Sequence, residues 1–262
     1  MHANLLPLMR CSRCGEGPLL GGDEQVSCSA CSAVFSASDG ILDMLGGAYG
    51  GRITPFQRIM QTRMVVAIYE GLWRRAGYFI ASSRSFNKEL ATVLAMTSGK
   101  DAARLVDLAC GPGIFTRPLA RQSRGIVVGV DLSLPMLRHA RRLLRRDGLD
   151  KVALVRASAA ALPFSDGAFS YVNCCGALHL FDNPDAGLAE IRRILSVGGH
   201  LCVQTTIRPV RSAGMAYLLE RFIRFGFFEK ESLDGKLANL GFKILESERH
   251  RISYTFVCRR IL

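Results

Sequence analysis

Long apolar runs are missing from this chain. Even the longest, such as Met64–Ile68, are far shorter than the roughly 20 residues that a helix needs to cross a bilayer. The N-terminus has no basic segment followed by a long apolar stretch, and Leu5–Leu8 is too brief for a signal peptide. Internal repeats and low-complexity tracts are also absent. We therefore expect a cytoplasmic globular protein without membrane insertion.

Acidic residues are scarce relative to basic ones. The chain holds 22 acidic and 34 basic residues, a formal net charge of +12. This balance favours an anionic partner: nucleic acid, a phosphorylated metabolite, an acidic carrier protein or a membrane surface. Much of the excess is arginine within Pro135–Arg146, where a solvated helix face is an equally good explanation. Charge alone does not select a substrate.

Nine cysteines are present, and four of them form two CxxC pairs near the N-terminus: Cys11, Cys14, Cys28 and Cys31. Two such pairs, joined by a hairpin, can place four thiolates around one metal ion in a closed tetrahedral site. Such a site is structural because no coordination position remains for substrate. The alternative is two redox pairs or unligated thiols. The other five cysteines lie in apolar segments, which fits a reducing compartment better than a disulfide framework. The sequence thus predicts a structural Zn²⁺ ion.

Strand and helix patterns alternate after Asp101. Strands are expected over Arg104–Ala109, Ile126–Asp131, Val152–Ala157, Phe169–Cys174, His200–Thr206 and Arg251–Arg259. Helices are expected over Ile114–Gln122, Leu134–Asp147, Pro184–Leu195, Met215–Phe225 and Glu231–Leu240. This alternation predicts a Rossmann-like α/β fold, a doubly wound and mostly parallel sheet with helices on both faces.

The sequence divides into three segments. Residues 8–45 form the zinc-ribbon module, with short strands at Gln25–Ser27 and Val34–Ser36. Residues 46–100 begin with a glycine-rich joint and continue as a helical linker or lid, with helices expected over Pro55–Tyr78 and Phe86–Met96. Residues 101–262 form the α/β domain, so the length accommodates one full domain and a small appendage.

The first predicted strand leads into a glycine turn with the pattern D-x-x-C-G-x-G, from Asp107 to Gly113. The next strand ends at Asp131, where a carboxylate can accept both hydroxyl hydrogens of a ribose. That arrangement serves NAD, FAD and S-adenosylmethionine (SAM) equally well. The glycine spacing differs from the GxGxxG suited to a pyrophosphate, and Met136 could lie against adenine or belong to the core. The pattern therefore favours SAM.

At these residues the chain resembles the class I SAM-dependent methyltransferases, in particular those similar to quinone-biosynthesis methyltransferases. The likeness continues through Ala161–Phe164, Ala177–His179 and Glu190–Gly199. The resemblance implies that residues 101–262 are a SAM-binding methyltransferase domain. It implies these SAM-binding residues: Asp107, Ala109, Cys110, Gly111 and Gly113 near the methionine part, Asp131 at the ribose, Leu132, Met136, Ser158 and Ala159 at the adenine, and Cys174 and Cys175 near the sulfonium.

Two positions depart from the family pattern. Ala109 stands where glycine is commonest, and Ser158 replaces an aspartate that in many relatives binds the adenine amino group. A backbone contact tolerates the first change, and a serine hydroxyl can still accept a hydrogen bond. We expect SAM binding to survive both.

A zinc ribbon followed by a methyltransferase domain resembles two groups. One comprises uncharacterised plant chloroplast and bacterial zinc-ribbon methyltransferases, with a likeness that continues through Tyr69–Arg75. The other comprises bacterial methyltransferases that modify a guanine of ribosomal RNA. The first group is closer, and the two imply different substrates.

Methyl transfer requires a positioned nucleophile and, for some acceptors, removal of its proton. The candidate base is His179, with a pocket-shaping loop histidine as the alternative. Candidate substrate-pocket residues are Tyr69, Trp73, Tyr78 and Phe222, although aromatic residues at helical spacing also serve as core. No Asn/Asp-Pro-Pro-Tyr/Phe motif follows the fourth strand, which disfavours amino methylation of adenine or glutamine.

These observations predict a SAM-dependent methyltransferase of a small, largely apolar metabolite, with O-methylation favoured and a role in secondary metabolism. The acceptor could be carried on an acidic carrier protein. Two alternatives stay open: a ribosomal RNA guanine methyltransferase that uses the zinc ribbon and the basic surface of the protein to bind RNA, and a non-catalytic SAM-binding module. The sequence does not address the oligomeric state.

Overall fold

The computed structural model describes residues 4–46, 58, 62, 74–100, 103–209, 221 and 225–262. The N-terminal segment contains η1 (Leu6–Leu8), β1 (Leu19–Gly21), β2 (Gln25–Cys28), β3 (Val34–Ser38) and β4 (Ile41–Asp43). The following elements are α3 (Arg74–Ser82), α4 (Phe86–Thr97), β5 (Arg104–Leu108), α5 (Thr116–Gln122), β6 (Ile126–Asp131), α6 (Leu134–Arg146), β7 (Ala153–Arg156) and β8 (Phe169–Cys175). The chain then continues through η3 (Leu178–Leu180), α7 (Pro184–Ile194), β9 (Leu195–Thr206), α9 (Lys230–Asn239), β10 (Phe242–His250) and β11 (Ser253–Arg260).

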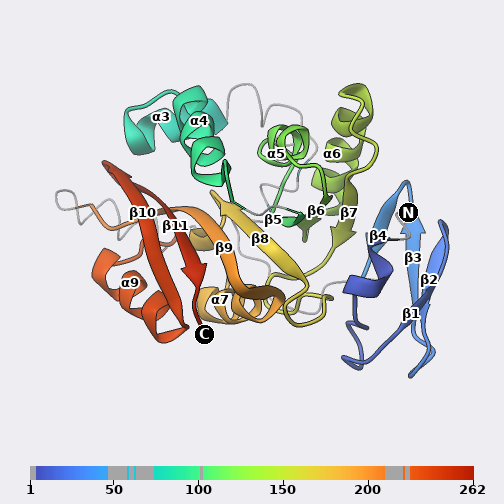
Figure 1. The fold of residues 1–262 in the computed structure, drawn as a ribbon. Coiled ribbons are helices and arrows are strands. Elements are labelled where there is room, and N and C mark those ends of the chain that lie inside the picture. The colour runs from blue at the N-terminus through green and yellow to red at the C-terminus, as the bar shows by residue number, and fades with distance from the viewer. Residues whose placement is uncertain are drawn as a thin grey trace.

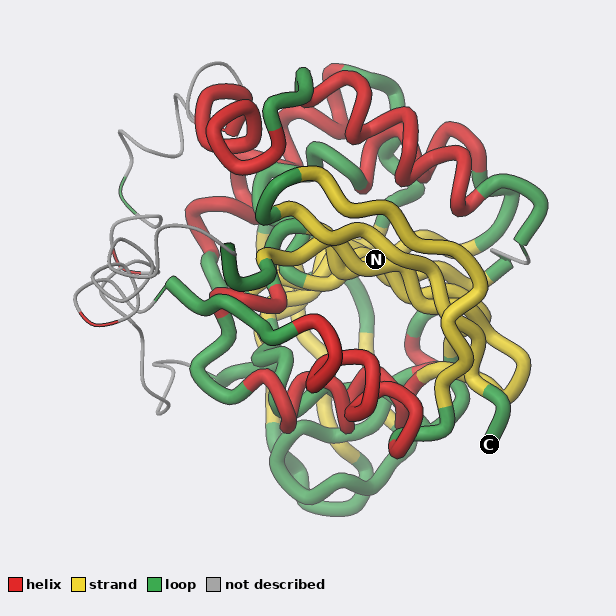
Figure 2. The backbone as a smooth tube through the Cα atoms, turned by 90° about the vertical axis from the view of Figure 1, so that its left-hand side faces the viewer, coloured by secondary structure: helices red, strands yellow, loops and turns green. Residues whose placement is uncertain are grey.

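One continuous sheet crosses the molecule in the order β1-β2-β3-β4-β7-β6-β5-β8-β9-β11-β10. The strands from β4 to β9 run parallel, whereas β11 and β10 are antiparallel. Helices α4, α5 and α6 cover one face, and α7 and α9 cover the other (Figure 1). Figure 2 shows the same sheet edge-on between the helical layers. The predicted doubly wound, Rossmann-like fold is confirmed.

The core consists of two apolar clusters, one on each face of the sheet. Side chains of a strand point alternately to opposite faces. Leu105 of β5 therefore packs in the cluster of α4, α5 and α6, while its neighbour Val106 packs in the cluster of α7 and α9. All seven residues of β8 are buried because helices cover this central strand on both sides.

Three strands were not predicted from the sequence. Strands β1 and β4 are only three residues long, too short for an apolar pattern. Strand β10 lies at the edge of the sheet and is mostly exposed, so its sequence lacks the apolar alternation of a half-buried strand. Most of the helix predicted over Met215–Phe225 and most of the one over Pro55–Tyr78 lie outside the described residues. No described helix has the length and hydropathy that a membrane span requires.

The ribbon strands extend the sheet of the α/β domain. Strand β3 pairs with β4 in antiparallel fashion, and β4 pairs in parallel with β7. A bridge also joins Met9 to Phe164, and both side chains belong to one buried cluster. Backbone pairing thus joins the N-terminal ribbon strands to the α/β domain. The exact domain boundaries stay a prediction.

Candidate cofactor and metal sites

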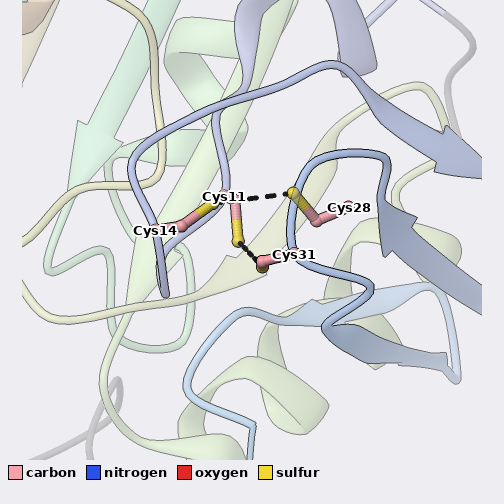
Figure 3. Close-up of side chains that lie close together, drawn as sticks. All are labelled: Cys11, Cys14, Cys28 and Cys31. Carbon is pink, nitrogen blue, oxygen red and sulfur yellow. Dashed lines mark hydrogen bonds between the residues drawn. The ribbon is translucent and has the colours of Figure 1, made fainter.

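The four N-terminal cysteines converge at one point (Figure 3). Their sulfur atoms all lie within 4.8 Å of one another, with 3.7 Å between Cys11 and Cys31 and 3.7 Å between Cys14 and Cys28. Four thiolates at tetrahedral zinc, with Zn–S bonds of about 2.3 Å, place their sulfurs about 3.8 Å apart. None of the four forms a disulfide. The residues therefore fit a closed Cys₄ zinc site.

The turn after β5 holds a left-handed backbone at three positions. The φ angles are +54° at Ala109, +54° at Gly111 and +84° at Gly113. Glycine adopts this conformation freely, whereas a residue with a Cβ atom pays roughly 1 kcal/mol. The geometry at Ala109 explains why glycine is the commoner residue there. The turn also leaves backbone N–H groups near the end of β6.

The carboxylate of Asp131 ties this turn to β6. One oxygen accepts a hydrogen bond from the Gly111 N–H at 2.7 Å, and the other accepts one from the Ser133 N–H at 2.8 Å. Burial raises the pKa of this carboxyl above its usual range, and the two N–H donors oppose that shift. The sequence predicted both Gly111 and Asp131 at the site, and the structure brings them into direct contact.

Asp107 lies beneath the turn and is buried. Its carboxylate accepts hydrogen bonds from the Thr116 hydroxyl at 2.5 Å and the Asn173 amide at 2.7 Å. Desolvation raises the pKa of Asp107 to about 6, and the negative charge of Asp131 adds to the shift. A cationic ligand beside Asp107 would favour its charged form. Neither Thr116 nor Asn173 was among the residues predicted for the site. The available signal was the single amide side chain in the largely apolar strand β8.

The residues predicted for adenine gather at the neighbouring strand ends. Leu132 follows β6, and Met136 is buried in the first turn of α6, where its N–H donates to the Ser133 hydroxyl at 3.4 Å. After β7, the Ser158 hydroxyl accepts a hydrogen bond from the Ala160 N–H at 3.2 Å, and Ala159 is half-buried. Since β6 and β7 are adjacent, these residues lie along one edge of the sheet.

The two adjacent cysteines at the end of β8 point to opposite faces. Cys175 packs in the cluster of α4, and its thiol donates to the Asn173 side-chain oxygen at 3.1 Å. Cys174 packs in the cluster of α7 and α9. Burial raises the pKa of both thiols well above the usual range. The Cys175 thiol thus contacts the same Asn173 side chain that donates to Asp107. Cys110 packs in the same apolar cluster as Cys175.

His179 lies in η3 and is only 7% exposed. Its Nδ1 is 3.4 Å from the Thr205 hydroxyl oxygen, and its ring centroid is 4.8 Å from that of Phe225. The His179 carbonyl accepts a hydrogen bond from the Gly226 N–H at 2.9 Å. Phe225 and Gly226 therefore pack directly on this histidine. Its role as a base stays a prediction.

Of the predicted substrate-pocket residues, Tyr69, Trp73 and Phe222 lie outside the described residues. Tyr78 is buried on α3, where its hydroxyl donates a hydrogen bond to the Glu89 carboxylate. The same carboxylate accepts a second hydrogen bond from the Thr255 hydroxyl at 2.9 Å. Glu89 is 1% exposed, and burial raises the pKa of Tyr78 to about 12. Nothing in the sequence indicated that Glu89 is buried, because a glutamate in a helix is ordinarily a solvent-exposed residue.

Comparisons with known proteins agree with this geometry. Residues 105–199 match the family model of a methyltransferase domain. An uncharacterised chloroplastic methyltransferase of Arabidopsis thaliana is 30% identical over 195 residues, which cover 70% of this chain and 54% of that protein. A demethylmenaquinone methyltransferase of Thermus thermophilus is 38% identical over 120 residues, covering 45% of this chain and 54% of that protein. The chain thus spans about half the length of these curated relatives.

A similar fold also occurs in a solved structure. The phosphoethanolamine N-methyltransferase 2 of Haemonchus contortus, in complex with S-adenosylhomocysteine, is 23% identical and has a TM-score of 0.61. The match covers 74% of this chain and 44% of that one, and at this identity it supports the fold alone. The motif series, the Asp131–Gly111 contact and the matching family model lead to one conclusion. Residues 105–199 form a methyltransferase domain, within a chain whose N-terminal strands extend the same sheet.

Proposed function

We propose that this protein transfers a methyl group from SAM to a small, largely apolar acceptor, with oxygen favoured as the atom methylated. The observation that carries this proposal is the 2.7 Å hydrogen bond from the Gly111 N–H in the glycine turn to the Asp131 carboxylate. SAM supplies an electrophilic methyl group on a sulfonium. The protein's part is to bind that cation, orient it and exclude water from it.

Each residue of the site has a defined task in this proposal. The Asp131 carboxylate, held in place by the Gly111 and Ser133 N–H groups, would accept the ribose hydroxyls. The Asp107 carboxylate, fixed by Thr116 and Asn173, would bind the positively charged methionine part. Opposite charges close together in a buried site attract strongly. The arrangement therefore favours a cationic cofactor over an anionic dinucleotide.

An aromatic surface beside His179 supports an apolar acceptor. The rings of Phe225 and Phe227 lie 5.3 Å apart, and Phe225 also contacts His179. Such rings contribute apolar contact area with little loss of side-chain entropy. A natural-product acceptor, free or on an acidic carrier protein, would suit this surface. We also propose a structural zinc ion in the Cys₄ site and a reducing, cytoplasmic location.

A basic helix face is the one observation that favours RNA as the acceptor. Arg138, Arg142 and Arg145 are exposed on α6. Their phosphate contacts would make binding fall steeply with salt. Arg138, however, lies 3.8 Å from the carboxylate of Asp39, so part of this charge is balanced within the protein.

The test is transfer of a tritiated methyl group from SAM into total RNA and into small-molecule extracts, at low and high salt. We expect label in the organic-extractable fraction, with a modest salt response. Label in RNA that disappears at high salt would support the RNA methyltransferase instead. Absence of SAM binding by calorimetry would contradict the proposal altogether.

We expect His179→Ala to lower kcat by about 10²–10⁴-fold, the contribution typical of a general base, with SAM affinity retained. The matched control is His139→Ala, which removes a half-buried histidine of α6. Thermal melting checks that the loss of packing against Phe225 has not unfolded the site. Unchanged turnover with intact SAM binding would remove His179 from the mechanism.

A further inference from the structure

Three neighbouring strands end in charged residues that lie in register. Asp43 of β4 pairs with Arg156 of β7, and Arg156 pairs with Asp131 of β6. The ribbon and the ribose-binding carboxylate thus flank the same arginine. The Arg156 and Asp43 side chains are only 18% and 20% exposed. This junction is where the metal module meets the cofactor site.

The Arg156 guanidinium joins the two sides. Its Nη1 donates to the Asp43 carboxylate at 2.8 Å, and its Nε donates to the Leu132 carbonyl at 3.1 Å. Leu132 directly follows Asp131, and its loop carries the predicted adenine contacts. An arginine fixed by a carboxylate holds its other N–H groups in a defined direction. Asp43 therefore orients the bond that restrains the Leu132 carbonyl.

The same junction connects to the turn from Cys11 to Cys14, which carries two of the four cysteines of the candidate zinc site and is called the knuckle below. The Ser12 hydroxyl donates to the Met44 carbonyl at 2.5 Å, and the Met44 N–H donates to the Arg156 carbonyl at 3.0 Å. Ser12 lies between Cys11 and Cys14 in the sequence. Two hydrogen bonds thus separate the knuckle from Arg156. A change in the knuckle that moves Met44 also moves the strand end that carries Arg156.

We propose that Arg156, held by Asp43, is a positioning residue for SAM, and that the metal-bound ribbon thereby sets the affinity of the cofactor site. This inference rests on the proposed function. Two sites coupled in this way influence each other equally. Zinc in the ribbon strengthens SAM binding, and SAM strengthens zinc retention by the same factor. Arg156 touches the loop that binds the cofactor and takes no part in the methyl transfer.

The chain offers a matched control. Asp39 and Arg138 also join the ribbon region to the α/β domain, but they lie 3.8 Å apart and their side chains are 66% and 57% exposed. In the described part of the chain, neither Asp39 nor Arg138 hydrogen-bonds to the loop after β6. Exposed pairs of this kind contribute little. Removing this pair changes the ribbon contact without releasing Leu132.

The experiment compares Asp43→Ala, Asp43→Asn and Asp39→Ala in the zinc-loaded, full-length chain. Calorimetry measures the Kd for SAM, and melting curves check folding. We expect Asp43→Ala to weaken SAM binding about tenfold, within the range typical of coupled sites, with Asp43→Asn in between and Asp39→Ala within about twofold of the wild type. The KM for SAM should rise with kcat at saturating SAM unchanged, a split that a general loss of structure does not give.

The second measurement is zinc release to a chromogenic chelator, with and without SAM. We expect SAM to reduce zinc loss in the wild type and in Asp39→Ala, but much less in Asp43→Ala. Equal SAM affinity in Asp43→Ala and wild type, or no effect of SAM on zinc retention, would overturn the inference. A wild type that binds no SAM would instead overturn the proposed function, so the two failures are distinguishable.

Discussion

Asp131→Ala is expected to weaken SAM binding by at least about a hundredfold, because hydrogen bonds to a charged group contribute about 1.5–3 kcal/mol each and this carboxylate would supply two to the ribose. The change also leaves the N–H groups of Gly111 and Ser133 without their 2.7 and 2.8 Å partner. Titration calorimetry with SAM gives the affinity, and circular dichroism tests whether the fold is retained.

The isosteric Asp131→Asn is the matched variant. It keeps one acceptor oxygen but loses the charge, so its affinity should lie between those of the alanine variant and the wild type. If both variants bind SAM as the wild type does, Asp131 does not hold the ribose. If the wild type binds NAD or FAD in preference to SAM, the cofactor itself has been assigned wrongly.

Loss of the zinc ion is expected to unfold the ribbon and to lower the melting temperature of the whole chain. Structural zinc contributes apparent free energies of about 10–16 kcal/mol in small metal-dependent folds. Here the last ribbon strand pairs with β7 of the catalytic sheet, so the loss reaches beyond the ribbon. Cys28→Ser, or chelation of the wild type, should lower the melting temperature by at least about 5 °C, the shift that roughly 2 kcal/mol produces in a chain of this size.

Metal content per chain and melting curves measure this effect. Ser27→Ala is the control, because it changes the residue beside Cys28 and removes only a 3.4 Å hydrogen bond to the Leu20 carbonyl. A wild type that purifies without metal and melts at the same temperature with chelator present would support the alternative of redox pairs. Detection of a disulfide between the CxxC cysteines would point the same way.

Much of the fold could be predicted because the central strands are long and buried on both faces. Strands β5, β6 and β8 are each mainly apolar in sequence, and the glycine turn marks where the first of them ends. The ligand-binding carboxylate was predictable for a related reason: Asp131 is an acid at the tip of such a strand. The local sequence pattern was sufficient to predict a strand wherever the strand is buried along its whole length.

The remaining site residues depend on contacts between distant segments. Asn173 reaches Asp107 across neighbouring strands, and Glu89 meets Thr255 from a helix 166 positions earlier. Arg156 joins Asp43 across 113 positions, through a three-residue strand that no periodicity reveals. A sequence pattern reports on neighbours along the chain. It does not report which polar groups the sheet order brings together.

The strand order leaves few backbone groups on which another molecule could add a strand. At one end, β4 occupies the side of β7 that would otherwise be open, and the terminal β1 has only three residues. At the other end, β10 is exposed but carries charged residues such as Lys243, Glu246 and Glu248. Short and charged outer strands oppose pairing between copies. Strand β4 of the ribbon therefore also shields the edge of β7 from pairing with another chain.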